Sequence, residues 1–395
     1  MLNIFLTLIV LTTVSIGDLY HQYFILLIFF LFQLTRKNVN FLFKPIPASF
    51  LFYLPLICIV VWIYGILHAI WLGVPFATYS RNFASLIFYF VFYLVYIYTP
   101  TARSLFDLFK RLALAYLIIS FFYIFKNYGS VDIIAFDEYG TSALRLYFSV
   151  GLLVLFVPIV FIAMGYATST QLALFNSKTY WNRGIFWDFL SLVLFVGVIL
   201  ASGSKGFYLA LLVLFIFIFI LVLIKVITSL RLSSFNAFVF LLAFVAFSYN
   251  SDLVVSFVEV LVRLESDDLH PRVVQGRELI ADFSLLGNGI GSSISSGYAR
   301  DELGYGFELS YHNLVHKLGL FSFFVFVTII YPFVISIKNI IKKECMQASV
   351  LSFSLMLYVI PAYGNPFLIS PLTVTFNVIA FYLIFQKSRF KRNAL

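Results

Sequence analysis

The sequence predicts an all-α integral membrane protein with about twelve transmembrane helices and one long external loop. The 395-residue chain is 62% hydrophobic and 20% aromatic, well above the roughly 45–50% apolar usage of soluble domains. Apolar runs long enough to cross a bilayer as helices recur from one end of the chain to the other. These runs do not alternate between polar and apolar residues, which excludes a transmembrane β-barrel.

The apolar runs define the predicted spans in order. The first run lacks a basic leader and a small-residue cleavage site, so we expect it to stay as a helix and not to be a removed signal peptide. No segment repeats and no low-complexity linker occurs, so residues 1–395 form one polytopic domain that contains the external loop, residues 251–310. The predicted spans are 2–17, 20–34, 49–71, 79–98, 108–126, 146–168, 185–201, 205–228, 234–250, 311–335, 346–361 and 368–385.

Charge predicts the orientation of these helices. With a cytoplasmic N-terminus, 17 of the 26 lysines and arginines face the cytoplasm, and only Asp107, Asp188 and Glu344 of the 17 acidic residues do so. This is the bias expected for cytoplasmic loops, and it explains the net charge of +9 without a nucleic-acid partner. An even number of spans returns the basic C-terminal tail to the cytoplasm. The long loop is therefore external.

The external loop is the only long polar segment of the chain. Polar residues from Asp252 to Arg263 recur at helical spacing, which fits either a helix on the membrane surface or an extension of the preceding span. After Pro271, residues 272–283 are expected to form a short helix with Arg272 and Arg277 about 140° apart around its axis. The two cysteines, one in a span and one in a basic connecting loop, are not expected to pair.

Cations near the outer ends of the spans are the main candidate binding residues. A basic side chain near the hydrocarbon boundary requires a partner, and arginine matches phosphate oxygens with a planar fork of donors. Six such residues suit binding and stabilising a pyrophosphate leaving group. Lys126 is one of the six, but for it, and for Arg263 outside the six, we favour a role as an interfacial anchor or as a partner of an outer carboxylate. The six cations are Arg81, Lys126, Arg145, Lys205, Arg272 and Arg277.

Two further features lie between the short helix and the next span. The run Leu286-Gly-Asn-Gly-Ile-Gly291 lacks the strand–turn–helix context of a dinucleotide site, so it either turns N–H groups toward an anion or lets the loop re-enter the bundle. His312 and His316 have the spacing of a zinc pair but lack an intervening glutamate, so no metal is expected. His312 can instead move a proton or contact a phosphate, with Glu308 orienting it or acting as the base.

These motifs resemble a known family in their order and membrane placement. The segments Arg272-Val-Val-Gln-Gly-Arg277, Leu285-Leu-Gly-Asn-Gly-Ile-Gly291 and Tyr311-His-Asn313 are similar to the external loop and following helix of the O-antigen polymerase and O-antigen ligase superfamily. Leu200-Ala-Ser-Gly-Ser-Lys-Gly206 resembles the family's Ser-Arg-Gly motif, with lysine in place of arginine. The resemblance covers roughly residues 79–335.

The resemblance implies a GT-C-like helical bundle in the bacterial inner membrane, with cytoplasmic termini and a periplasmic active site. It implies a metal-independent, cofactor-free polymerase in lipopolysaccharide biosynthesis, which transfers a growing glycan from undecaprenyl pyrophosphate to an undecaprenyl-pyrophosphate-linked repeat unit. Its partners would be these lipid-linked oligosaccharides, the bilayer and a chain-length regulator protein. The family positions map to His312, Arg277 and Lys205, with Arg272 beside them, and we include Glu308, Arg145 and Arg81 in the expected site.

Two other functions remain open at this stage. An O-antigen ligase shares the architecture and differs in its acceptor, the lipid A core. A transporter of lipid-linked oligosaccharide would place ionisable groups and broken helices near the bilayer midplane, often in repeated halves. The ionisable residues here cluster near span ends and no repeat is evident, which favours glycan transfer over transport.

Overall fold

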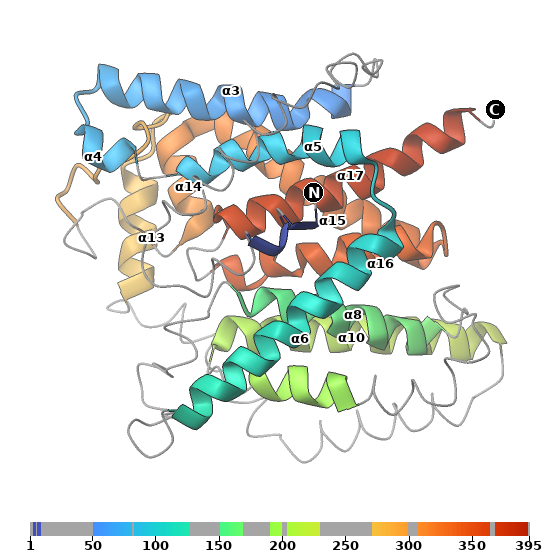
Figure 1. The fold of residues 1–395 in the computed structure, drawn as a ribbon. Helices are drawn as coiled ribbons and strands as arrows, with labels where there is room; N and C mark the ends of the chain where they lie inside the picture. The colour runs from blue at the N-terminus through green and yellow to red at the C-terminus, as the bar shows by residue number, and fades with distance from the viewer. Residues whose placement is uncertain are drawn as a thin grey trace.

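The computed structural model describes residues 3–4, 6–8, 50–80, 83–126, 151–168, 190–199, 204–229, 271–298, 307, 309–363 and 368–393. Within these ranges every regular element is a helix. Most helices lie lengthwise beside one another, and α6 (Ala102–Lys126) crosses them obliquely (Figure 1). The expected spans 2–17, 20–34 and 234–250 and the amphipathic segment 252–263 lie outside the described residues, apart from the few near the N-terminus.

The helices have the length and composition of a membrane protein. Four in the described part are long and apolar enough to cross a membrane: Phe50–Trp71, Gly206–Leu223, Ser310–Ile341 and Met346–Tyr363. Shorter apolar helices cover Ala84–Tyr98, Leu153–Met164, Leu190–Ile199 and Pro371–Gln386. The prediction of a helical protein with membrane-type helices is confirmed over these ranges.

Many helix bounds match the predicted spans, but α6 begins six residues before the predicted residue 108, α15 (Ser322–Ile341) ends six residues after 335, and α17 (Pro371–Asn393) ends eight residues after 385. Helix α13, predicted within 272–283, spans Pro271–Ala281, where the proline occupies the first helical position because it needs no N–H partner there. The remaining long elements are α3 (Phe50–Trp71), α5 (Val91–Tyr98), α8 (Leu153–Thr168), α10 (Lys205–Ser229) and α16 (Met346–Met356).

Helix α3 ends at Trp71, just before Gly73 and Pro75. Gly73 has a φ of +72°, a left-handed conformation that glycine adopts without a steric penalty. The N–H of Leu72 donates to His68 O (3.0 Å) and that of Val74 to Ala69 O (3.0 Å), which satisfies the last carbonyls of the helix. Pro75 then precedes the short helix α4 (Phe76–Tyr79). The chain therefore turns sharply at one end of the bundle.

Two predicted spans are interrupted. Span 79–98 is divided into the end of α4, a left-handed residue at Phe83 (φ 53°), a 3-10 segment η2 (Ala84–Phe90) and α5. Span 311–335 is divided by Gly319 into α14 (Ser310–Leu318), the short η4 (Gly319–Phe321) and α15. A Cβ on Gly319 would lie 2.2 Å from the carbonyl oxygen of Leu285, so the break coincides with a close approach of the preceding loop.

The centre of the bundle is built from α15, α16 and α17, with α16 packed against both neighbours and against α8. Ser349, Ser352 and Ser354 of α16 are buried, and small residues of this kind let helix backbones approach closely in a membrane.

A group of buried polar side chains links three helical segments that are far apart in sequence. The Tyr89 hydroxyl lies 3.0 Å from Thr328 Oγ1 and accepts a hydrogen bond from Asn377 Nδ2 at 2.9 Å.

Candidate functional site

Helices α13 and α14 pack together at one end of the bundle (Figure 1). Gln275 of α13 is fully buried, and its Oε1 accepts a hydrogen bond from the N–H of Leu309 (3.0 Å), just before α14 begins. Leu279, Ile294, Phe307 and Leu309 form a small apolar core of their own beneath this contact. The arginine-bearing helix and the histidine-bearing helix are therefore joined by both packing and a hydrogen bond.

The carboxylate of Asp282, one residue beyond α13, joins the end of α13 to two positions in the following loop and to α14. Its Oδ2 accepts hydrogen bonds from His316 Nε2 (2.8 Å) and from Asn288 Nδ2 (3.2 Å). Ser295 donates to the same carboxylate through its hydroxyl and through its backbone N–H (3.3 Å). Asn288 Nδ2 also donates to the Asp282 carbonyl at 2.7 Å.

The electrostatics of Asp282 follow from these partners. Partial burial acts to raise the pKa of its carboxyl group, but the hydrogen bonds from Ser295 and His316 outweigh burial and lower the pKa below its ordinary value. Asp282 is therefore an anion at neutral pH. It fixes the end of α13, the loop and α14 in one arrangement.

The glycine run lies against the bundle and not in open solvent. Gly287, Gly289 and Gly291 each have a φ of +81°. Added Cβ atoms would lie 2.4 Å from Lys317 O, 2.8 Å from Ala69 Cα and 2.6 Å from Tyr79 N, respectively. Only glycine allows both this backbone conformation and this close approach.

The backbone N–H groups of the run are used within the protein. Asn288 N–H donates to His316 O (2.9 Å), Gly289 N–H to Lys317 O (3.1 Å) and Ile290 N–H to Gly65 O (3.2 Å). Of the two sequence interpretations, re-entry into the bundle matches these bonds, because the same N–H groups are not directed at an anion.

Helix α3 holds the loop from the other side. The Tyr64 hydroxyl donates to the Leu286 carbonyl (3.0 Å), and His68 Nε2 donates to the Gly287 carbonyl (3.1 Å). The two rings stack with their centroids 5.6 Å apart. The loop is thus clamped between α3 and α14.

Lys317 is completely buried in this clamp. Its Nζ donates to the carbonyl oxygen of Ser292 and to Ser292 Oγ (3.3 Å), and it lies 4.9 Å from the centre of the Phe307 ring. These oxygen acceptors and the ring face satisfy the polar group at the end of the buried side chain. Lys317 therefore holds the loop in place and does not face an external ligand.

A hollow of about 280 Å³ lies between α13, α14 and α15. Tyr311 and His312 supply its polar groups, and the other lining residues are Leu279, Ile280, Phe283, Val315 and Phe326. The Tyr311 hydroxyl donates to the Val359 carbonyl (2.7 Å). Nδ1 of His312 has no hydrogen-bond partner among the described residues.

The expected site residues are distributed as follows. His312 lines the hollow, whereas Arg277 is exposed on α13 and Arg272 is partly exposed, and neither arginine lines the hollow. Lys205 is the first residue of α10, but its side chain lies outside the described part, and so does that of Lys126. Arg81, Arg145 and Glu308 also lie outside it.

Helix α10 reaches the same region through a shared neighbour. The 3-10 turn η6 (Pro361–Tyr363) contacts both α10 and α14. The ring of Tyr363 lies 6.4 Å from that of His312, centroid to centroid. The helix that begins with Lys205 and the helix that carries His312 therefore meet the same short segment.

The sequence did not single out His316 or Asn288 as parts of one network with Asp282. The position of His316, one helical turn after His312, was noted in the sequence, but this spacing indicates only that the two histidines share a helix face and does not identify Asp282 as a partner. In the structure, His316 is buried and its Nε2 is bonded to Asp282. Among the residues that the structure describes, no group of three or more His, Cys, Asp and Glu side chains has a geometry that could hold a metal ion.

Comparisons with protein-family models, with curated proteins and with solved structures found no match to this chain.

Proposed function

We propose that the chain is a glycosyltransferase of the O-antigen polymerase type in the bacterial inner membrane, with its active site on the periplasmic side. It would transfer a growing glycan from undecaprenyl pyrophosphate to an undecaprenyl-pyrophosphate-linked repeat unit. The observation that supports this most is the packing of α13, which carries Arg272 and Arg277, against α14, which carries His312 beside a hollow. The apolar helices supply the setting that a lipid-linked substrate requires.

The proposed reaction is a single displacement. The acceptor hydroxyl attacks the anomeric carbon as the bond from that carbon to the pyrophosphate oxygen breaks, and the electron pair leaves with the pyrophosphate. The configuration at that carbon inverts. The transition state resembles an oxocarbenium ion, as in other glycosyl transfers.

Each proposed site residue has a role in this step. Arg272, Arg277 and Lys205, with Arg145 and Arg81, neutralise the developing charge on the leaving group, which removes the need for a strong general acid. His312 takes the hydroxyl proton or contacts a phosphate oxygen, with Glu308 as its orienting partner or as the base. Nδ1 of His312 supports this role, because it is a buried imidazole nitrogen that bonds to none of the described residues and is therefore a candidate to bond to substrate.

Purified full-length protein in liposomes, supplied with defined lipid-linked repeat units, tests the proposal. We expect products that stay on the polyprenyl pyrophosphate and grow by whole repeats. Glycan on an added lipid A core would identify a ligase instead. Movement of the lipid-linked sugar across the bilayer without new glycosidic bonds would identify a transporter and contradict the proposal.

A further inference from the structure

The loop that follows α13 runs beside α3 well inside the end of that helix. Ile290 N–H donates to Gly65 O (3.2 Å), and the Tyr64 hydroxyl donates to the Leu286 carbonyl (3.0 Å). Gly65 precedes Trp71, the last residue of α3, by about 9 Å along the helix axis, since an α-helix rises about 1.5 Å per residue. The loop therefore passes α3 between its end and its middle.

Helix α3 is long enough to place this level inside a bilayer. Its 22 residues are apolar enough to cross a membrane, and they span about 33 Å, slightly more than a hydrocarbon core about 30 Å thick. Trp71 is 85% exposed, and an exposed tryptophan at the end of a span is typical of the membrane–water interface. With α3 as a span, the level of Gly65 lies within the hydrocarbon layer.

The backbone of the loop meets the requirement that such a position imposes. Irregular backbone at membrane depth is tolerated only where the protein itself supplies its hydrogen bonds. His68 Nε2 bonds to the Gly287 carbonyl (3.1 Å). The N–H groups of four successive residues donate to backbone carbonyls of the protein, namely those of Gly287, Asn288, Gly289 and Ile290.

The side chains that this part of the loop exposes are apolar. Phe283, Leu285 and Leu286 are 45%, 62% and 56% exposed. The next two exposed side chains along the chain are those of Ser293 and Ser295. The loop thus changes from an apolar to a polar surface between Leu286 and Ser293.

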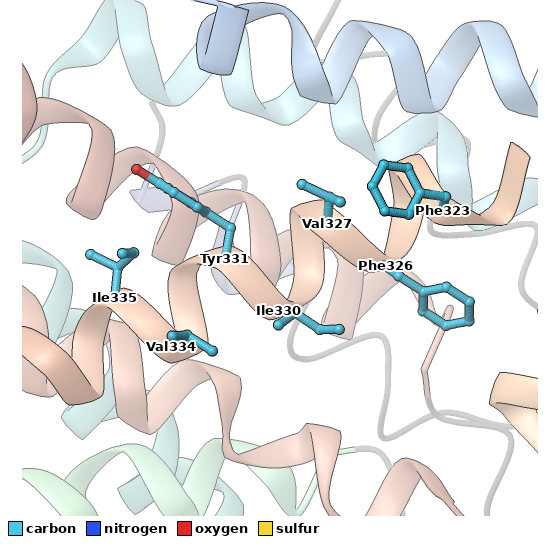
Figure 2. A pocket seen from close by; sticks show the side chains of 7 residues that line it. All are labelled: Phe323, Phe326, Val327, Ile330, Tyr331, Val334 and Ile335. Carbon is cyan, nitrogen blue, oxygen red and sulfur yellow. The ribbon is translucent and has the colours of Figure 1, made fainter.

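The apolar surface of the loop continues onto the exposed face of α15. The N–H of Leu320, a residue that is 64% exposed, donates to the Leu285 carbonyl (2.9 Å). From there the exposed residues Phe323, Ile330 and Val334 follow along α15, as Figure 2 shows.

The exposed face of α3 lies on the other side of the same surface. Val60, Ile63 and Leu67 are exposed, and their spacing of three and four residues places them in one stripe. Tyr64, which bonds to the loop, is the neighbour of Ile63 in this helix. Bilayer lipid is therefore the occupant that fits, because the loop shares one apolar surface with the faces that two membrane-type helices expose.

We propose that residues 283–286 insert into one leaflet of the bilayer, where Phe283, Leu285 and Leu286 contact acyl chains, while the loop around Ser293 lies in water. Part of the predicted external loop is then a re-entrant segment. This inference goes beyond the proposed glycan transfer and does not rest on it, because it depends only on α3 as a membrane span.

Spin labels on introduced cysteines test the inference in full-length protein, reconstituted in nanodiscs of phosphatidylcholine and phosphatidylglycerol. The exposed Cys345 is replaced by serine, and Cys58 is buried. Power saturation compares collisions of the label with oxygen, which dissolves in hydrocarbon, and with a nickel chelate, which stays in water. We expect the ratio of oxygen to nickel collisions to be several-fold higher for Leu285→Cys and Leu286→Cys than for Ser293→Cys.

Leu67→Cys is the matched control, because Leu67 is a similarly exposed leucine (61%) on α3. Its ratio should equal that of the two loop leucines, and either loop variant suffices if the other does not fold. Nickel collisions at Leu285→Cys and Leu286→Cys as frequent as at Ser293→Cys would overturn the inference. Few collisions with both reagents, together with dipolar broadening between labels, would show that a second copy of the chain covers the surface and would overturn it as well. Because no product is scored, the result is independent of transferase activity.

Discussion

At the scale of single residues, the Asp282 carboxylate organises the loop. It accepts hydrogen bonds from Asn288 and Ser295 of the loop and from His316 of α14. A partly buried anion with several donors is more stable folded than unfolded as long as it stays ionised. The arrangement of α13 beside α14 therefore depends on pH through this group.

We predict that Asp282 makes the protein acid-sensitive. Its folded pKa is lowered, so its stabilising effect is present above the unfolded pKa of about 3.9 and disappears as pH falls through the lower folded value. Asp282→Asn should lower the Tm at pH 7 and reduce the drop in Tm between neutral pH and pH 3. Thermal unfolding of the detergent-solubilised protein measures both effects.

Asp107→Asn is the control for this prediction, because Asp107 is an exposed carboxylate on α6. Its Tm should follow that of the wild-type protein at every pH. An Asp282→Asn variant with an unchanged Tm at pH 7 would mean that the carboxylate does not hold the loop.

At the scale of elements, the glycine run joins α3, α4 and α14. The three glycines allow contacts that no side chain could fit. The N–H groups of Asn288 and Gly289 donate to backbone carbonyls of α14, and that of Ile290 donates to a carbonyl of α3. The loop is therefore a packed part of the bundle.

We predict that Gly289→Ala is more destabilising than Gly297→Ala. Both positions have positive φ, +81° and +75°, so both variants incur the left-handed strain of roughly 1–2 kcal/mol. Only at Gly289 would the new Cβ meet backbone, 2.8 Å from Ala69 Cα, whereas at Gly297 it meets open space. Thermal unfolding and protease sensitivity of the loop measure the difference, and equal losses would show that the loop does not need to lie against α3.

The sequence predicted the helices well and the loop contacts poorly. Apolar runs bounded α3 and α10 to within about one residue, because a membrane span is set by local composition. The bonds of His316 and the burial of Lys317 depend on residues 25 or more positions away. Periodicity carries no information about such contacts, so the helical spacing of His312 and His316 could not predict that His316 bonds to Asp282.

At the scale of the whole molecule, the loop and the chain end lie at opposite ends of the bundle. Helices α13 and α4 are at one end, and the C-terminus is at the other (Figure 1). In the proposed topology, which rests on the basic tail and the bias in lysine and arginine, the C-terminal end would lie in the cytoplasm. The site around α13 and α14 would then face the periplasm.

We predict that a membrane-impermeant maleimide distinguishes the two ends in spheroplasts. Ser293 is exposed in the loop, so Ser293→Cys should be labelled from outside. The native Cys345 is exposed at the turn between α15 and α16 and should be labelled only after the membrane is opened. Labelling of Cys345 in sealed spheroplasts would reverse the proposed orientation.

The central claim is that Arg277 and His312 act together on a lipid-linked pyrophosphate. The most direct measurement is the product-length distribution of purified Arg277→Ala and His312→Ala proteins, with Arg103→Ala as control because Arg103 is an exposed arginine in the first turn of α6. We expect products of a single repeat from the two site variants and wild-type chain lengths from the control. Normal chain lengths from Arg277→Ala or His312→Ala would contradict the account.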